Sequence, residues 1–205
     1  MYSHGVQADQ EEKLMALLPI ATNSYAAFRA DALARAAQNL GYNVDDWLGY
    51  QCWDLAAELW MNLPEFANTG LWPHTGPNLA ARECWTVSRT ENAGDSFDLI
   101  YNLSNVKRGD VIVIDASAIS DVGHIAFADE DYNGTTRMNL LGQNQVNPSP
   151  TVGHIPTVTN LDVSAFLGAF RLKSWTPTPP HPGTSTRTSR LPLIMWSAGL
   201  FNNEL

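Results

Sequence analysis

Hydrophobic residues in the first half of the chain recur at helical spacing. Residues 24–40, S-Y-A-A-F-R-A-D-A-L-A-R-A-A-Q-N-L, place apolar side chains three or four positions apart, which is the period of one helix face. Ser24 belongs to the residue types that cap helix N-termini, and Gly41 to those that end helices. The same pattern predicts three further helices, at residues 9–18, 52–62 and 78–84.

From about residue 106 the pattern changes to short apolar runs rich in β-branched residues. Asn133-Gly134, a dipeptide typical of hairpin turns, separates the second of these runs from the third. Helices first and antiparallel strands second predict an α+β fold, with the N-terminal helices packed on an antiparallel sheet. The runs that predict strands are residues 111–115, 123–128, 136–145 and 166–172.

The two ends of the chain differ from its middle. Residues 1–24 form a polar, acidic N-terminal segment with one short helix, unlike the basic and then apolar start of a signal peptide. Residues 25–175 carry the predicted domain. Residues 176–190 are rich in proline and threonine and predict an extended linker. Residues 191–205 are apolar but too short to span a membrane, so we expect them to anchor the chain to another protein surface.

Composition narrows the classes of partner. A hydrophobic fraction of 44% is enough for a sizeable core. The formal net charge of −9 argues against nucleic acid, because phosphate binding needs a basic surface, whereas it suits a metal cation. The seven tryptophans and six tyrosines fit either core packing or stacking on sugars and peptides. The two cysteines, Cys52 and Cys84, are too few for a disulfide framework.

Cys52 is the first candidate for chemistry. It lies where the loop N-V-D-D-W-L-G-Y-Q-C-W-D, residues 43–54, meets a predicted helix. A helix N-terminus and a nearby histidine both favour the thiolate form of a cysteine. The pattern therefore fits a nucleophile, although a small buried core residue fits the same position.

His124, in G-H-I-A-F-A, is the candidate base for such a nucleophile. Strand alternation places His124 on the face of Ala126 and Ala128, where we expect a helix to pack. Asn144, in L-L-G-Q-N-Q, is a candidate to orient the imidazole, and Gln51 is a candidate to donate to an oxyanion. Each of these residues also has a purely structural interpretation, as a core histidine, a turn amide and a loop residue.

Four motifs occur in a fixed order over residues 25–175: Q-C-W-D, K-R-G-D-V-I-V-I, G-H-I-A-F and G-Q-N-Q. Together they resemble the CHAP family of cysteine- and histidine-dependent amidohydrolases and peptidases, which is related to the NlpC/P60 proteins. The resemblance implies a papain-like α+β fold, Cys52 as nucleophile and His124 as base. Many CHAP domains carry a glutamate where this chain has Gly142. Asn144 is therefore the predicted orienting residue, with Asp115 and Glu130 as alternatives.

The loop before Cys52 also resembles the calcium loop of a subset of CHAP domains. The side chains of Asn43, Asp45 and Asp54 and the carbonyl groups of Trp47 and Gly49 supply oxygen donors, which suit Ca²⁺ better than zinc. The alternative is that the carboxylates only cap or turn the loop. No organic cofactor is expected.

The resemblance implies a hydrolase of peptidoglycan amides from a phage of a Gram-positive host. It would be an N-acetylmuramoyl-L-alanine amidase, an endopeptidase or both, acting on stem or crossbridge peptides. We expect an endolysin or a virion tail-associated lysin, with residues 191–205 as the contact to other tail proteins. The alternative is a catalytically silent wall-binding or structural tail module on the same scaffold. A cysteine peptidase acting on proteins has no positive feature in this sequence.

Overall fold

A computed structural model places the middle of the chain. It describes residues 20–46, 48–64, 66, 73–74, 80–90, 96–115, 120–149 and 151–175. The predicted helix at 9–18, the linker at 176–190 and the apolar segment at 191–205 lie outside these residues.

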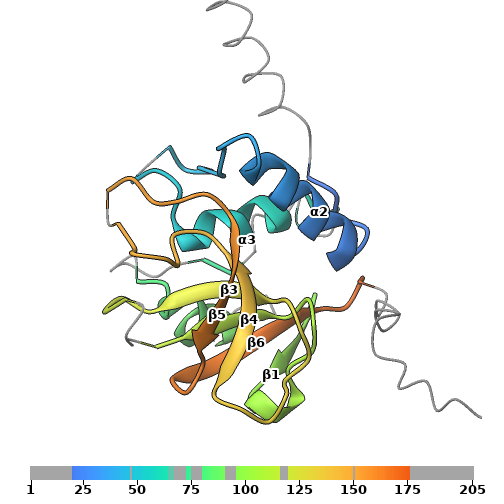
Figure 1. Cartoon of the computed structure of the whole chain (residues 1–205). Helices are drawn as coiled ribbons and strands as arrows, with labels where there is room; N and C mark the ends of the chain where they lie inside the picture. Colours follow the sequence, from blue (N-terminus) through green and yellow to red (C-terminus); the bar gives the residue numbers. More distant parts are fainter. Residues whose placement is uncertain are drawn as a thin grey trace, which may run out of the picture.

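The described residues form one antiparallel sheet covered by helices on one side (Figure 1). The six strands follow the order β1-β6-β2-β3-β4-β5, and each neighbouring pair is antiparallel. The α+β prediction is therefore confirmed. The strands are β1 Phe97–Ile100, β2 Val111–Ile114, β3 His124–Ala128, β4 Arg137–Gly142, β5 Thr157–Asp162 and β6 Phe166–Leu172. The helices are α2 Tyr25–Ala36, α3 Cys52–Met61 and α4 Glu83–Thr86, with 3-10 turns η1 Ser88–Thr90 and η3 Leu103–Asn105.

Helix α2 starts where the sequence predicts and ends earlier. The Ser24 hydroxyl accepts a hydrogen bond from the Ala27 N–H at 3.3 Å, which confirms the predicted N-cap. The helix stops at Ala36, before the predicted end at residue 40. Asn39 adopts a left-handed backbone with φ of 61°, a conformation that asparagine tolerates and that ends helices.

The two strands that the sequence did not predict, β1 and β5, form the edges of the sheet. In β5, T-V-T-N-L-D, only Leu161 is buried, because an edge strand covered on one side at most needs few apolar residues. The strands β2, β3, β4 and β6, in contrast, fall on the predicted apolar runs. Of the helix predicted at 78–84, residues 78–79 lie outside the described residues, residues 80–82 are not helical, and the single turn α4 occupies Glu83–Thr86.

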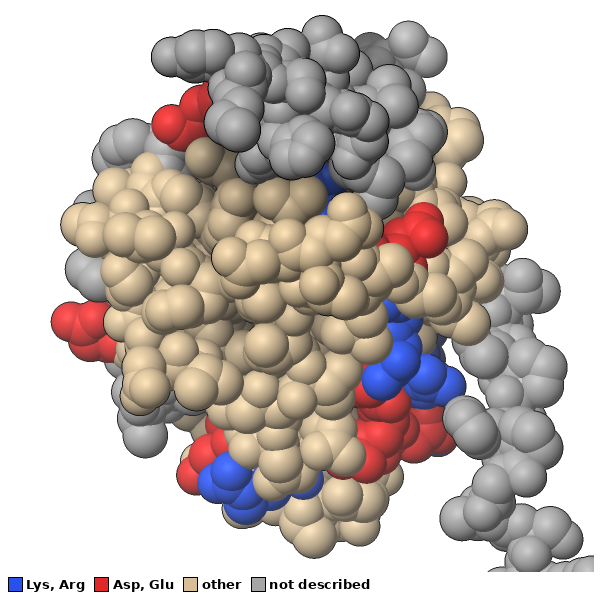
Figure 2. All heavy atoms as spheres, turned by 45° about the horizontal axis from the view of Figure 1, so that its top comes forward, with Lys and Arg blue, Asp and Glu red and all other residues tan. Residues whose placement is uncertain are grey.

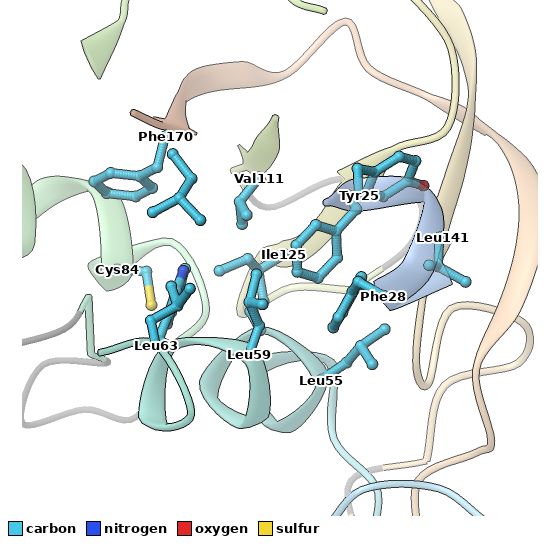
Figure 3. Close-up of a cluster of buried hydrophobic side chains, with 14 of the residues drawn as sticks. Tyr25, Phe28, Leu55, Leu59, Leu63, Cys84, Val111, Ile125, Leu141 and Phe170 are labelled. Carbon is cyan, nitrogen blue, oxygen red and sulfur yellow. The ribbon is translucent and has the colours of Figure 1, made fainter. Parts of the chain in front are cut away.

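The main core lies between the helices and the sheet, where side chains of α2 and α3 meet Ile125 of β3 (Figure 3). Phe127 of β3 belongs to the same cluster. A second cluster on the opposite face contains Ala126 and Ala128. The expectation that a helix packs on the Ala126 face is therefore wrong. Ile125 and Phe127 are the larger side chains, so burying their face removes more apolar surface from water.

The side chain of Asp54 fixes the first turn of helix α3. The Asp54 carboxylate accepts hydrogen bonds from the Gln51 N–H at 2.8 Å and from the Val44 N–H at 3.0 Å. Leu55 and Leu59 of α3 are buried in the same cluster as Ile125 of β3. The first residue of α3, Cys52, is consequently placed at the beginning of β3.

Two loops meet beside Cys52. The Tyr50 N–H donates to the Val152 carbonyl at 2.9 Å, and the His154 N–H donates to the Tyr50 carbonyl at 3.1 Å. Figure 1 shows the loop before α3 and the loop before β5 side by side. Gly153 has a φ of 67°, and a Cβ atom there would lie 1.9 Å from the Tyr50 oxygen. Only glycine allows this close approach of the two backbones.

We expect Gly153→Ala to lower the free energy of unfolding by more than Gly134→Ala does. Both glycines have positive φ, which costs an alanine about 1–2 kcal/mol, but nothing lies within 4 Å of a Cβ atom at Gly134. The difference between the variants therefore isolates the clash with Tyr50. Chemical denaturation of both variants measures it, and equal losses would contradict the proposed role of the contact.

Candidate active site

The Cys52 thiol is half-buried at the N-terminus of α3, and both cysteines of the chain are free. Burial raises the pKa of Cys52 to about 11; the backbone N–H of Ile125 opposes this rise, and the charge of Asp54 adds to it. The N–H groups of Trp53 and Cys52 also act on the sulfur and favour the thiolate. At neutral pH the thiol is therefore protonated, and its reaction as a nucleophile requires a base.

His124 directly precedes Ile125, whose backbone N–H reaches the Cys52 sulfur. Its side chain is only 1% exposed. Burial lowers the pKa of His124 to about 4, and a hydrogen bond to the Gln145 side-chain oxygen opposes this shift. The imidazole is therefore uncharged at neutral pH and able to accept a proton, as a base for Cys52 must be.

Gln145, which the sequence analysis did not single out, contacts His124. The two side chains are joined by a hydrogen bond of 3.4 Å between His124 Nε2 and Gln145 Oε1. The only signal in the sequence is the last letter of G-Q-N-Q, and its spacing does not distinguish it from the other amides.

Asn144, the predicted orienting residue, bonds instead to the loops around Cys52. Its Nδ2 donates to Gln51 Oε1 and to the Ser149 carbonyl, both at 2.8 Å. Its Oδ1 accepts from the Ser149 N–H at 2.8 Å and lies 3.0 Å from His154 Nδ1. Asn144 has a φ of 51°, so the chain turns after β4 and the side chain of the next residue, Gln145, reaches His124. Asn144 therefore connects the loops around Cys52. The contact with His124 that the sequence predicts for Asn144 is made by Gln145.

The two alternative orienting residues also have other partners. Glu130 accepts the Asn139 N–H at 2.9 Å and the Asn139 side-chain amide at 3.2 Å. Asp115 lies 3.9 Å from Arg82, and about half of its side chain is exposed.

The Gln51 side chain is engaged in the loop network. Its Nε2 donates to the Leu48 carbonyl and, at 3.4 Å, to the Ser149 carbonyl, while its Oε1 accepts from Asn144. The amide protons of Gln51 are therefore taken up by these two carbonyl groups, and an oxyanion role requires the side chain to turn.

The predicted calcium ligands include one unusual atom. Asn43 Oδ1 is buried without a hydrogen-bond partner among the described residues. Burial raises the pKa of Asp54 to about 7, and the charge of Asp45 adds to this rise. A cation next to these oxygens would satisfy Asn43 and offset the repulsion, so the oxygen donors fit a hard ion. Trp47 lies outside the described residues, and within those residues no three His, Cys, Asp or Glu side chains cluster as a metal site.

The surface on the helix side carries mixed charges. Figure 2 shows a face that is mostly uncharged, with basic and acidic side chains next to each other at its margins. Ion pairs such as Arg171–Asp110, at 2.8 Å, and Lys107–Asp131, at 3.0 Å, account for several charges of the domain. Within the part of the chain that the structure describes, no helix has the length and apolar character to cross a membrane.

No family model and no curated protein matches this sequence. Among solved structures, endolysin LysIME-EF1 matches with a TM-score of 0.51 at 23% sequence identity, over 70% of this chain and 63% of that one. In fold, this chain is similar to an endolysin. Two structures of Ly7917, one with the hydrolyzing product of MDP, match with TM-scores of 0.40 at 17% and 15% identity, each over 69% of this chain and 61% of that one. The chain thus spans less than two thirds of each of these proteins.

We expect the buried, neutral His124 to make the protein less stable in acid. Its pKa is about 4 in the folded chain against an ordinary value of 6.5, so between these pH values the unfolded chain binds a proton that the folded chain does not. The free energy of unfolding should therefore fall as the pH drops from 6.5 to 4, by up to about 3 kcal/mol.

Denaturation curves at several pH values measure this slope. The matched control, His124→Gln, cannot titrate there and should lose less stability over the same range. An identical slope in the two proteins would show that His124 is not the titrating group.

Proposed function

We propose that this chain is a cysteine-dependent peptidoglycan hydrolase, with Cys52 as nucleophile and His124 as base. The observation that carries the proposal is the junction of α3 and β3. There the thiol at the helix N-terminus accepts the Ile125 N–H, and the adjacent His124 is buried and uncharged. The resemblance to the CHAP family and the fold shared with an endolysin support the same conclusion.

The reaction starts from a neutral pair. His124 takes the thiol proton as the Cys52 sulfur attacks the carbonyl carbon of the amide. The carbon–nitrogen bond then breaks, the imidazolium gives its proton to the leaving amine, and a thioester remains on Cys52. Water, deprotonated by His124, attacks the thioester, and the departing thiolate recovers the proton. Every proton that His124 takes is given back, so the only reactants consumed are the amide and one water molecule.

The negative charge on the carbonyl oxygen needs a donor near the sulfur. The first N–H groups of an α-helix have no acceptor within the helix, and the Cys52 N–H is one of them. It lies next to the attacking atom and is suited to stabilise the oxyanion.

The substrate follows from the resemblance. The chain would cut an amide in the stem or crossbridge peptides of a Gram-positive wall, as an amidase, an endopeptidase or both, and would belong to a phage. It would act as an endolysin or as a tail-associated lysin, with residues 191–205 contacting other tail proteins. Mass spectrometry of the fragments released from purified peptidoglycan distinguishes the bonds, because each cut leaves a different new terminus.

The second candidate function is a wall-binding or structural module without activity. Gly142 favours it, because the carboxylate that many CHAP domains carry at this position is missing. A protein of this kind would bind walls without releasing fragments, and Cys52 would not affect binding.

We expect Cys52→Ala to abolish the release of soluble fragments from purified Gram-positive peptidoglycan, with a rate loss of at least about 10³-fold, because losing a catalytic nucleophile removes the covalent route. Cys84→Ala is the matched control, since Cys84 is a fully buried thiol in the core. It should keep the activity in proportion to its folded fraction. A wild-type protein that binds walls but releases nothing would favour the silent module.

We also propose that the loop before α3 holds Ca²⁺. Asn43, Asp45 and Asp54 would supply side-chain oxygens, and Trp47 and Gly49 would supply carbonyl oxygens. When bound, the ion would fix the loop that leads into Cys52.

Chelation with EDTA should therefore lower the melting temperature, since a ligand at 100 times its dissociation constant adds about 2.7 kcal/mol to stability. Added Ca²⁺ should restore the transition, and Mg²⁺ should not. In Asp45→Asn, which keeps the shape and removes one charge, the shift should be smaller. A melting temperature that EDTA leaves unchanged in the wild type would rule out the site.

A further inference from the structure

We propose that Gln145 is the positioning residue of His124, and that it reaches the imidazole through the space that a side chain at position 142 would otherwise fill. This inference rests on the proposed function for its catalytic meaning. The contact between Gln145 and His124 is present in the folded protein without substrate, so it can be tested without measuring turnover.

The orientation of the Gln145 amide is decided by its neighbours. Its Nε2 donates to the Leu140 carbonyl at 3.0 Å and to the Thr157 carbonyl at 2.7 Å, and it lies 3.2 Å from Thr157 Oγ1. Carbonyl oxygens only accept hydrogen bonds, so the nitrogen of the amide must face them. The oxygen, Oε1, then faces His124, because the reversed amide would set oxygen against two carbonyl oxygens.

This orientation selects the tautomer of His124. An amide oxygen only accepts, so the nitrogen 3.4 Å away, Nε2, carries the hydrogen. In a neutral imidazole the other nitrogen, Nδ1, then has the free electron pair. Gln145 thus makes Nδ1 the atom that accepts the thiol proton, and it keeps the ring from rotating.

The lack of a side chain at Gly142 leaves room for this arrangement. A Cβ atom at position 142 would lie 2.6 Å from Gln145 Oε1 and 2.9 Å from the Ala126 Cβ. Both distances are shorter than two such atoms allow, so a side chain at 142 would displace the Gln145 amide from its present position. The glycine that departs from the family pattern is therefore what admits Gln145.

A neutral amide has a different electrostatic effect from a carboxylate. It accepts the Nε2 hydrogen but contributes no full negative charge, so the imidazolium gains little, and burial keeps the pKa of His124 low. Ionisable side chains on the neighbouring elements are Cys52, Asp54 and Glu58 on α3, Arg137 on β4, Glu83 on α4 and, between elements, Asp115 after β2 and Arg82 before α4. The site therefore rests as an uncharged thiol and imidazole.

Long-range ¹H–¹⁵N NMR of the imidazole in the full chain tests the proposal directly. In the wild type we expect a single tautomer, protonated at Nε2. In Gln145→Leu, which keeps the volume but removes the acceptor, we expect a mixture of tautomers and a lower pKa. In Gln145→Glu the new negative charge should raise the pKa of His124 by about 1 to 3.

Two further variants separate positioning from structural support. Thr157→Val removes one anchor of the Gln145 amide but leaves both carbonyl acceptors, so the tautomer should stay as in the wild type. Gly142→Ala keeps Gln145 but pushes Oε1 aside, so it should give the mixed tautomers of Gln145→Leu. This variant also provides the test if Gln145→Leu does not fold. An unchanged imidazole spectrum in folded Gln145→Leu or folded Gly142→Ala would overturn the proposal.

Kinetics connect the contact to turnover. With peptidoglycan fragments as substrate, Gln145→Leu should lower kcat at least about 10-fold with KM nearly unchanged, because general-base catalysis contributes about 10²–10⁴-fold and the base is only partly lost. In Gln145→Glu the acid limb of kcat/KM should move to higher pH along with the pKa of His124. If no variant and no wild type turns over, the proposed function fails, while the NMR result still decides the role of Gln145.

Discussion

The packing of α3 against β3 is the constraint on which the rest of the site depends. Leu55 and Leu59 of the helix and Ile125 and Phe127 of the strand are buried in one cluster. Their burial sets the helix on the strand at one register, since a shift would expose large apolar side chains to water. The first residue of the helix, Cys52, therefore meets the Ile125 N–H of the strand, and His124 is the residue before Ile125.

Burial also decides the charge state of the site. It raises the pKa of Cys52 and lowers that of His124, so both shifts oppose a resting ion pair. Low solvent access makes each remaining hydrogen bond more important, because an unpaired polar group there is costly. This explains why the region around Cys52 and His124 holds a layer of buried polar side chains with defined partners. They are Asp54, His124, Gln143, Asn144 and Gln145.

Within this layer, neighbouring amides have separate tasks. Gln143 binds the Tyr42 backbone and the Gln51 carbonyl, which ties β4 to the loop before α3. Asn144 connects Gln51 to the loop before β5. Gln145 turns back to His124 and to the β4–β5 edge of the sheet. Three consecutive residues thus reach three parts of the site, because the left-handed backbone at Asn144 reverses the direction of the chain between them.

The sequence by itself determined the α+β class, the start of α2 at its Ser24 cap, the start of α3 at Cys52 and the four apolar strands. These features depend on local spacing and on capping residues, which are visible in a linear chain. The edge strand β5 was missed because a strand covered on one side carries a weak apolar pattern, and β1 was missed because it is only four residues long and its apolar run is interrupted by Asp98. Which face of β3 the helices cover depended on the sizes of side chains that meet only in the folded protein. Likewise, only the tertiary structure decided that Gln145, and not Asn144, contacts His124. The sequence alone does not distinguish the adjacent amide side chains of G-Q-N-Q from one another. The turn after β4 and the space left open at Gly142 direct one of them, Gln145, to the imidazole.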